Sequence, residues 1–125
     1  MARRDIQGAV DFDHLESYAA YDAGVISEVL VLFREQSALW LRLMDPQEGS
    51  EGWRDGAHTL KGAALGVGAF QLAEACSAAE AATGSGVGER TVLFGRVRDA
   101  LDAALADIAA YSHEQMLKGL KTPRS

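Results

Sequence analysis

The chain has 125 residues, 48% of them hydrophobic, with few aromatic residues and a formal net charge of −6. This length suits a single domain with a substantial core, and the acidic balance argues against nucleic acid or an anionic membrane as a partner. The single cysteine excludes an internal disulfide and fits a reducing compartment. Neither a bilayer-spanning apolar run nor a signal peptide is present in the sequence, so we expect a cytoplasmic protein.

Helical periodicity begins after a loose lead-in at residues 1–11. Asp13 has an acidic residue three positions later, which is the spacing of a helix N-cap, and it predicts a short helix from there to about Ala20. Asp22 is the next candidate N-cap. Apolar residues spaced by three and four behind it predict a long amphipathic helix, which Pro46 ends.

Three further helices are predicted in the rest of the chain. The first begins near residues 50–51 and ends in a Gly-Val-Gly sequence at residues 66–68, where glycine can adopt the left-handed conformation of a C-cap. The next has an inner face of mostly alanine and leucine and ends before a glycine-rich loop at residues 83–88. A long helix then opens at Glu89 and ends by Gly119.

These elements predict an all-α fold, because no segment alternates with the period of two that marks a strand. Four substantial helices joined by short loops form an antiparallel up-down four-helix bundle, with a short additional N-terminal helix. We expect the domain to span residues 12–118, between the lead-in at 1–11 and a tail at 119–125. No second long apolar stripe calls for dimerisation, so we expect a monomer.

The predicted helix around residues 50–66 carries a polar stripe beside its apolar one. His58, Lys61, Gly62 and Leu65 fall at i, i+3, i+4 and i+7, rotated by one residue from the apolar positions. A glycine inside a helix costs about 1 kcal/mol relative to alanine. We therefore expect the space that Gly62 leaves beside His58 to be used, although a close helix crossing would also explain a glycine there.

The residue types in this stripe favour phosphoryl transfer. An exposed imidazole is a nucleophile, Lys61 is close enough to pair with an anion attached to His58, and Gly62 leaves room for an incoming group. Leu65 adds an apolar contact. The sequence has no nucleotide-binding glycine loop and no acidic cluster suited to magnesium, so a partner must supply both the phosphoryl group and the metal.

A metal site is the main alternative chemistry for the histidine. Asp55 and His58, like Asp11 and His14, have the i, i+3 spacing of a carboxylate and a histidine that share a metal in a bundle. Such a site also needs carboxylates that face the bundle interior. The predicted inner stripes are leucine, alanine and valine, so we expect no metal.

A longer pattern surrounds these residues. It consists of His58-Thr59-Leu60-Lys61-Gly62, Gly68, Leu72, Cys76 and Glu80, preceded by Asp11-Phe12-Asp13-His14-Leu15, Asp22, Phe33 and Trp40-Leu41. This pattern resembles the signature of histidine-containing phosphotransfer (HPt) domains of bacterial two-component phosphorelays. The resemblance covers nearly the whole chain, and its combined spacing is far more specific than any one piece.

The resemblance implies a four-helix bundle in which His58 accepts a phosphoryl group from the aspartyl phosphate of a response-regulator receiver domain and passes it reversibly to another receiver. It also implies that Lys61 steadies the phosphate, that Gly62 permits close approach and that Glu80, where relatives often have glutamine, orients the imidazole. The implied partners are receiver domains and a hybrid histidine kinase. The chain would be a carrier and not an enzyme, with no cofactor of its own and with Mg²⁺ supplied by the receiver.

Two other functions use the same stripe. The chain is also compatible with the phospho-accepting substrate module of a histidine kinase, and with a receiver-binding adaptor whose His58 is never phosphorylated. In each case a partner must dock near the histidine. Leu65 and Phe70, which is one residue off the inner stripe of its helix, are the candidate contacts for that partner.

Overall fold

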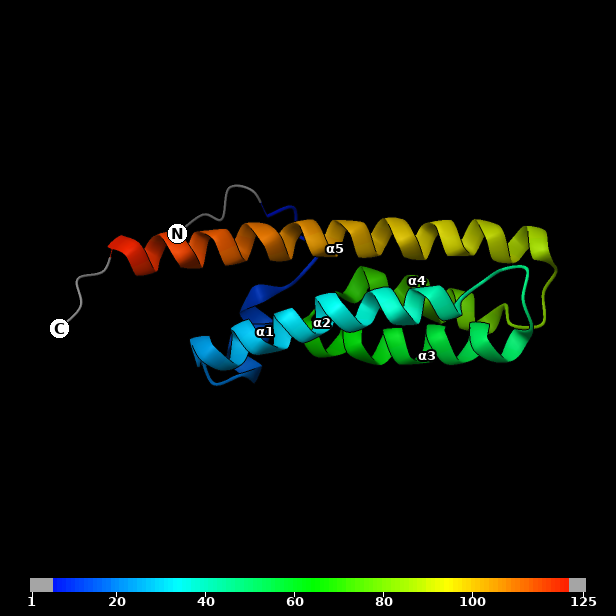
Figure 1. The fold of residues 1–125 in the computed structure, drawn as a ribbon, viewed down its shortest axis with the longest axis horizontal. Helices are drawn as coiled ribbons and strands as arrows, with labels where there is room; N and C mark the ends of the chain where they lie inside the picture. The colour runs from blue at the N-terminus through cyan, green and yellow to red at the C-terminus, as the bar shows by residue number, and fades with distance from the viewer. Residues whose placement is uncertain (1–5, 122–125) are drawn as a thin grey trace.

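The computed structural model describes residues 6–121, and this part of the chain forms five helices and no strand. The helices are α1 (Phe12–Tyr18), α2 (Ala23–Leu43), α3 (Ser50–Val67), α4 (Phe70–Ala81) and α5 (Val87–Lys121). The last four run alternately in opposite directions along one axis, and α5 spans the length of the molecule (Figure 1). The prediction of an antiparallel all-α bundle with a short leading helix is confirmed.

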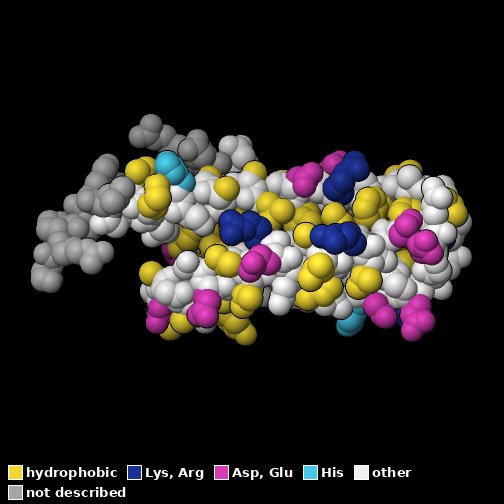
Figure 2. All heavy atoms as spheres, viewed as in Figure 1, with side chains coloured by type: hydrophobic (Ala, Val, Ile, Leu, Met, Phe, Trp, Pro, Cys, Tyr) yellow, Lys and Arg dark blue, Asp and Glu magenta, His cyan; other side chains and the backbone are white. Residues whose placement is uncertain are grey.

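Helix α3 lies at the centre of the packing, with α2 on one side and α4 on the other, while α5 packs mainly on α4. The inner stripe predicted for α3 is buried, as are most inner positions predicted for α2, α4 and α5. On the face seen in Figure 2, hydrophobic side chains follow the seam between α5 and the neighbouring helices, and charged side chains of both signs are spread around it. Within residues 6–121, no helix has the length and hydrophobicity needed to cross a bilayer.

Three of the predicted helix ends are formed as expected. The Asp22 carboxylate accepts hydrogen bonds from the N–H groups of Gly24 and Val25, which confirms it as the N-cap of α2. Gly68 follows α3 with φ of 85°, in the left-handed region, and its N–H bonds back to the helix. Helix α2 ends at Leu43, as expected for a helix that precedes Pro46.

The N-cap of α1 is Asp11, and the prediction of Asp13 is wrong. The Asp11 carboxylate accepts from the His14 N–H at 3.1 Å, which places Asp13 in the first turn of the helix. The backbone N–H of Asp11 donates to the Gly68 carbonyl oxygen at 2.9 Å, so a contact far along the sequence fixes where the helix begins.

The described part of the lead-in, residues 6–11, is not loose. The carboxylate of Asp107, on α5 and 1% exposed, accepts hydrogen bonds from the N–H groups of Gln7, Ala9 and Val10 at 2.7–3.2 Å. Ala9 and Val10 are themselves buried. Residues 1–5 lie outside the described part.

Helix α5 is longer than predicted at both ends. It begins at Val87, two residues before Glu89, and continues to Lys121, beyond Gly119. Glycine lowers helix stability but leaves the backbone hydrogen bonds intact, so neither Gly88 nor Gly119 stops the helix.

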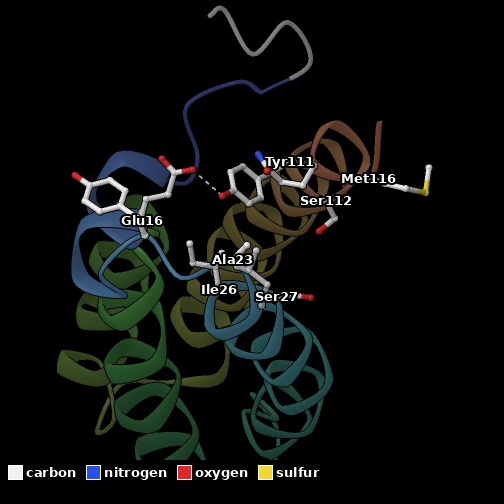
Figure 3. A pocket seen from close by; sticks show the side chains of 10 residues that line it. Glu16, Ala23, Ile26, Ser27, Tyr111, Ser112 and Met116 are labelled. Carbon is white, nitrogen blue, oxygen red and sulfur yellow. Dashed lines mark hydrogen bonds between the residues drawn. The ribbon is translucent and has the colours of Figure 1, made fainter. Parts of the chain in front are cut away.

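An open pocket of about 440 Å³ lies between the beginning of α2, α1 and the C-terminal half of α5. Glu16 of α1 and Tyr111 of α5 point toward each other across it, and the Tyr111 hydroxyl donates to the carboxylate of Glu16 at 2.7 Å (Figure 3). No residue of α3 or α4 lines this pocket, so it is separate from the histidine stripe.

Candidate functional site

His58 lies on the outer face of α3, opposite the buried stripe of that helix. Its side chain is 68% exposed, whereas Ala57 and Leu60 beside it are completely buried. Helical geometry explains why exposed and buried residues alternate here. Side chains of consecutive residues point about 100° apart around the helix axis, whereas residues three and four apart share a face.

The side chain of Glu80 bridges two members of the stripe. Its Oε2 lies 3.0 Å from Nδ1 of His58, and its Oε1 accepts a hydrogen bond from Nζ of Lys61 at 3.2 Å. Glu80 is on α4, so the packing of α4 on α3 brings the three residues together. His58 and Lys61 therefore contact the same carboxylate, each through a different oxygen.

The electrostatics of this cluster keep Glu80 ionised. Burial by itself would raise the pKa of the Glu80 carboxyl, but hydrogen bonds and charge interactions with Lys61 and His58 outweigh it and lower that pKa below its ordinary value. An ionised carboxylate can only accept hydrogen bonds. Nδ1 of His58 therefore carries the proton in this contact, and the lone pair of the neutral ring resides on Nε2.

Gly62 lies one turn beyond His58 and is exposed. A Cβ added there would meet nothing within 4 Å, which contradicts the alternative explanation that Gly62 marks a close helix crossing. That crossing occurs at Gly56, where a Cβ would lie 2.7 Å from the Trp40 carbonyl oxygen and 2.8 Å from Cγ of Met44. The surface next to His58 is thus open, and the closest approach of α2 to a glycine of α3 is at Gly56, six residues before Gly62.

The two candidate partner contacts lie on one hollow beside Lys61. Leu65 and Phe70 are both about half exposed, at 47% and 44%, and line it together with residues of α4. Phe70 also meets the ring of His14 edge-on, with centroids 5.3 Å apart. An apolar surface therefore extends from the stripe toward α4.

No group of three or more His, Cys, Asp or Glu side chains that could hold a metal occurs within residues 6–121. Cys76, one turn before Glu80 on α4, is fully buried, and its burial, together with the charge of Glu80, raises the pKa of the thiol to about 12. A thiol with this pKa stays protonated at neutral pH and is a poor nucleophile. Cys76 is buried and protonated, whereas the imidazole of His58 is exposed.

Comparison with known proteins shows the family of this chain. The model of the Hpt domain family matches residues 26–111, which is more than half of the chain. The chain belongs to the Hpt domain family. The crystal structure of histidine phosphotransferase ShpA from Caulobacter crescentus is 54% identical in sequence, with a TM-score of 0.75, and the match covers 91% of this chain and all of that one. A search of curated proteins gave no match.

Three of the site residues of this Hpt domain could be recognised by their spacing on one helix, since the stripe of His58, Lys61 and Gly62 is visible in the sequence. The contact of Glu80 with both His58 and Lys61 depends on how α4 packs and has no local signal. Sequence reasoning missed Trp53, which is buried on α3 and hydrogen-bonded to α4. Its position on the inner stripe of α3 marks it only as a core residue.

Proposed function

We propose that His58 accepts a phosphoryl group from the aspartyl phosphate of a receiver domain and passes it to an aspartate of another receiver. The observation that carries this proposal is the contact of His58 Nδ1 with the Glu80 carboxylate at 3.0 Å. That contact leaves the lone pair of the neutral ring on Nε2, in a side chain that is 68% exposed. Membership of the Hpt family supports a phosphorelay carrier in general terms.

In the forward step, the Nε2 lone pair attacks the phosphorus of the aspartyl phosphate. The new P–N bond forms as the P–O bond to the aspartyl carboxyl breaks, and the carboxylate leaves with the electron pair. The ring gains positive charge during the attack, and Glu80 stabilises that charge through the Nδ1–H hydrogen bond. Reversal of the same step transfers the group to a second aspartate.

Lys61 has a second task in this proposal. Its ammonium group donates to Glu80 at 3.2 Å, about one turn from the ring of His58. A phosphoryl group on Nε2 brings up to two negative charges close to it, and a flexible lysine can move to that stronger anion. Because Gly62 has no side chain, the space next to His58 is open and the phosphoryl donor can approach closely.

The phosphoryl donor must bring its own metal. The cluster of His58, Lys61 and Glu80 has one carboxylate and two cationic or donor groups, which is a poor ligand set for Mg²⁺. We therefore assign the Mg²⁺ to the receiver. In this proposal the phosphoryl donor is the receiver domain of a hybrid histidine kinase.

The docking surface of the receiver is proposed to include an apolar groove between α1, α2 and α3. The groove has a volume of about 370 Å³ and its lining includes Val25, Val29, Leu32, Trp40, Ala63 and Gly66. It is continuous with the site, because Gly66 of the groove lies one turn after Gly62 on α3. Leu65 and Phe70 border the site on the side of α4. The phosphorylated histidine would then lie between two apolar surfaces.

The test uses receiver domains phosphorylated with radiolabelled acetyl phosphate in Mg²⁺, mixed with the full chain, with His58→Gln or with Leu32→Glu. We expect label to move to the wild type and not to His58→Gln, in a form that acid removes and base does not. Leu32→Glu should slow transfer about tenfold, since it places a charge in the groove. The matched control is Val92→Glu, because Val92 is an exposed apolar residue of α5 outside the groove.

Transfer to His58→Gln at the wild-type rate would overturn the proposal. Labelling of His58 from ATP by a kinase domain, with no transfer from any receiver, would replace it with the kinase-substrate function. Tight receiver binding without any label on the wild type would point to an adaptor.

A further inference from the structure

Three helices of the bundle meet at Trp53. This residue lies on α3, five positions before His58, and is completely buried. Its indole Nε1–H donates a hydrogen bond to the carbonyl oxygen of Ala79 on α4 at 2.7 Å. From α5, the guanidinium carbon of Arg90 lies 5.9 Å from the centroid of the indole. One side chain therefore connects the helix of the histidine with both of the helices that follow it.

The hydrogen bond from Trp53 acts on the last turn of α4. Carbonyl groups there have no partner further along the helix and need one from elsewhere. The Ala79 carbonyl oxygen accepts from the Ala82 N–H at 3.1 Å as well as from the shorter indole contact. The N-terminus of α4 has no side-chain cap. At its C-terminus no left-handed glycine follows, and the Thr83 hydroxyl donates a hydrogen bond to the Glu80 carbonyl oxygen at 2.6 Å. The indole thus supplies a directional contact at the residue directly before Glu80.

Directional contacts between α3 and α4 are few. Within the described chain, the hydrogen bonds that join these helices are the Trp53 bond and the two bonds of Glu80. The rest of the interface is apolar and consists largely of small side chains, whose attraction has no preferred direction. A shift of α4 by about 1 Å would lengthen the contact of Glu80 with His58 beyond hydrogen-bond distance.

The guanidinium of Arg90, on α5, lies over the face of the indole ring. Arg90 is 9% exposed, and its Nε has no hydrogen-bond partner. Burial of an N–H group without an acceptor is costly, and the face of a tryptophan ring offsets part of that cost by attraction between the cation and the ring. This contact limits the freedom of the ring to tilt away from Ala79.

We propose that Trp53 is a positioning residue of the phosphotransfer site. Its indole N–H fixes the last turn of α4, so that the carboxylate of Glu80 reaches Nδ1 of His58 and keeps the lone pair on Nε2. The inference rests on the proposed function of His58 and adds to it a residue that touches neither the phosphoryl group nor the imidazole.

Two variants of the full chain test this role. Trp53→Phe removes the N–H together with part of the ring, and 3-benzothienylalanine at position 53 replaces the N–H with sulfur while it keeps the size of the indole. The first readout is the pair of ring ¹⁵N chemical shifts of His58 at neutral pH, which report the tautomer. The second is the rate of His58 phosphorylation by phosphoramidate, in which the P–N bond to Nε2 forms as ammonia leaves.

In the wild type we expect the shifts of one tautomer, with the proton on Nδ1. In both variants the shifts should move toward the average of two tautomers, and the rate should fall about tenfold. The matched control is Tyr111→Phe, which removes a hydrogen bond of the same 2.7 Å length from another buried aromatic residue, between α5 and α1. It should change neither readout, although it also removes a stabilising contact.

Unchanged ¹⁵N shifts and rate in the folded benzothienylalanine protein would overturn the inference, and so would equal changes in Tyr111→Phe. Failure of the proposed function is distinguishable from this result. If no receiver transfers label to the wild type, the function fails, yet the tautomer of His58 still shows whether Trp53 positions Glu80.

Discussion

At the scale of single residues, the carboxylate at position 80 determines how many hydrogen-bond donors can be bound at the site. A carboxylate offers two acceptor oxygens, and here one accepts from His58 and the other from Lys61. Glutamine has one acceptor oxygen, so the two donors would have to share it, and its amide N–H₂ can only donate. Because the cluster is partly exposed, these contacts add little to the stability of the fold. We expect their main effect to be on the orientation of the imidazole.

The lowered pKa of Glu80 makes its small contribution to stability depend on pH. A carboxyl group whose pKa is lower in the folded state stabilises the fold above its ordinary pKa of 4.5, and this stabilisation is lost as the pH falls through the lowered value. We expect the free energy of unfolding of the wild type to exceed that of Glu80→Gln at neutral pH, and the difference to vanish on acidification. Urea denaturation from about pH 7 down to pH 3 measures it.

The control for this titration is Asp102→Asn, an exposed carboxylate on α5. Because Asp102 is exposed, the stability of this variant should lie within about 0.5 kcal/mol of that of the wild type. A difference for Glu80→Gln that is the same at pH 3 and at pH 7 would show that the two donors do not favour the ionised carboxylate.

At the scale of helices, the sequence was most informative where the signal is local. Helices α2 and α3 were predicted almost to the residue, because Asp22, Pro46 and Gly68 act on their immediate neighbours. The start of α1 was missed, since Asp11 is fixed by the carbonyl of Gly68, far along the chain. The same holds at the site: the stripe of His58 lies on one helix and is visible in the sequence, whereas the contacts of Glu80 and Trp53 form only when α4 packs on α3.

Two glycines of α3 separate the effects of packing and of helix propensity. A Cβ at Gly56 would meet the Trp40 carbonyl oxygen and the Met44 side chain, so Gly56→Ala must push α2 away and should destabilise the fold by about 1–3 kcal/mol. A Cβ at Gly62 meets nothing within 4 Å, so Gly62→Ala should stabilise the fold by up to about 1 kcal/mol. Thermal or urea denaturation of the two variants measures both effects.

The substitution is identical and the helix is the same, so each variant is the control of the other. If Gly56→Ala were neutral, α2 and α3 could separate at no cost and the close crossing would not matter. A destabilised Gly62→Ala would mean that the space beside His58 is already occupied in the folded chain.

At the scale of the whole molecule, the N-terminal segment joins elements that are far apart in sequence. The N–H groups of Gln7, Ala9 and Val10 donate to Asp107 of α5, and the N–H of Asp11 then donates to Gly68 at the end of α3. Phe12 stacks on Tyr111 of α5, with ring centroids 4.2 Å apart. The sequence pattern could not show this closure, because a buried aspartate among the apolar residues of a long helix has no period of its own. The N-terminal segment thus connects α5 with the turn between α3 and α4.

The anchor of this segment is the carboxylate of Asp107, and its removal should have a large effect on stability. Asp107→Ala leaves the N–H groups of Gln7, Ala9 and Val10 without their acceptor in a largely buried environment, so we expect the free energy of unfolding to fall by about 3 kcal/mol. Amide hydrogen exchange at these three residues should accelerate far more than exchange in α3.

The control is Asp102→Ala, an exposed aspartate on the same helix, which should change stability by no more than about 0.5 kcal/mol. Phosphorylation of His58 in Asp107→Ala should stay close to the wild-type rate, because the anchor holds α1 and not the contact between α3 and α4. Slow exchange at Ala9 and Val10 in Asp107→Ala would show that burial alone holds the segment. A strong loss of phosphorylation would instead mean that closure of the N-terminal segment is transmitted to Glu80 through the end of α3.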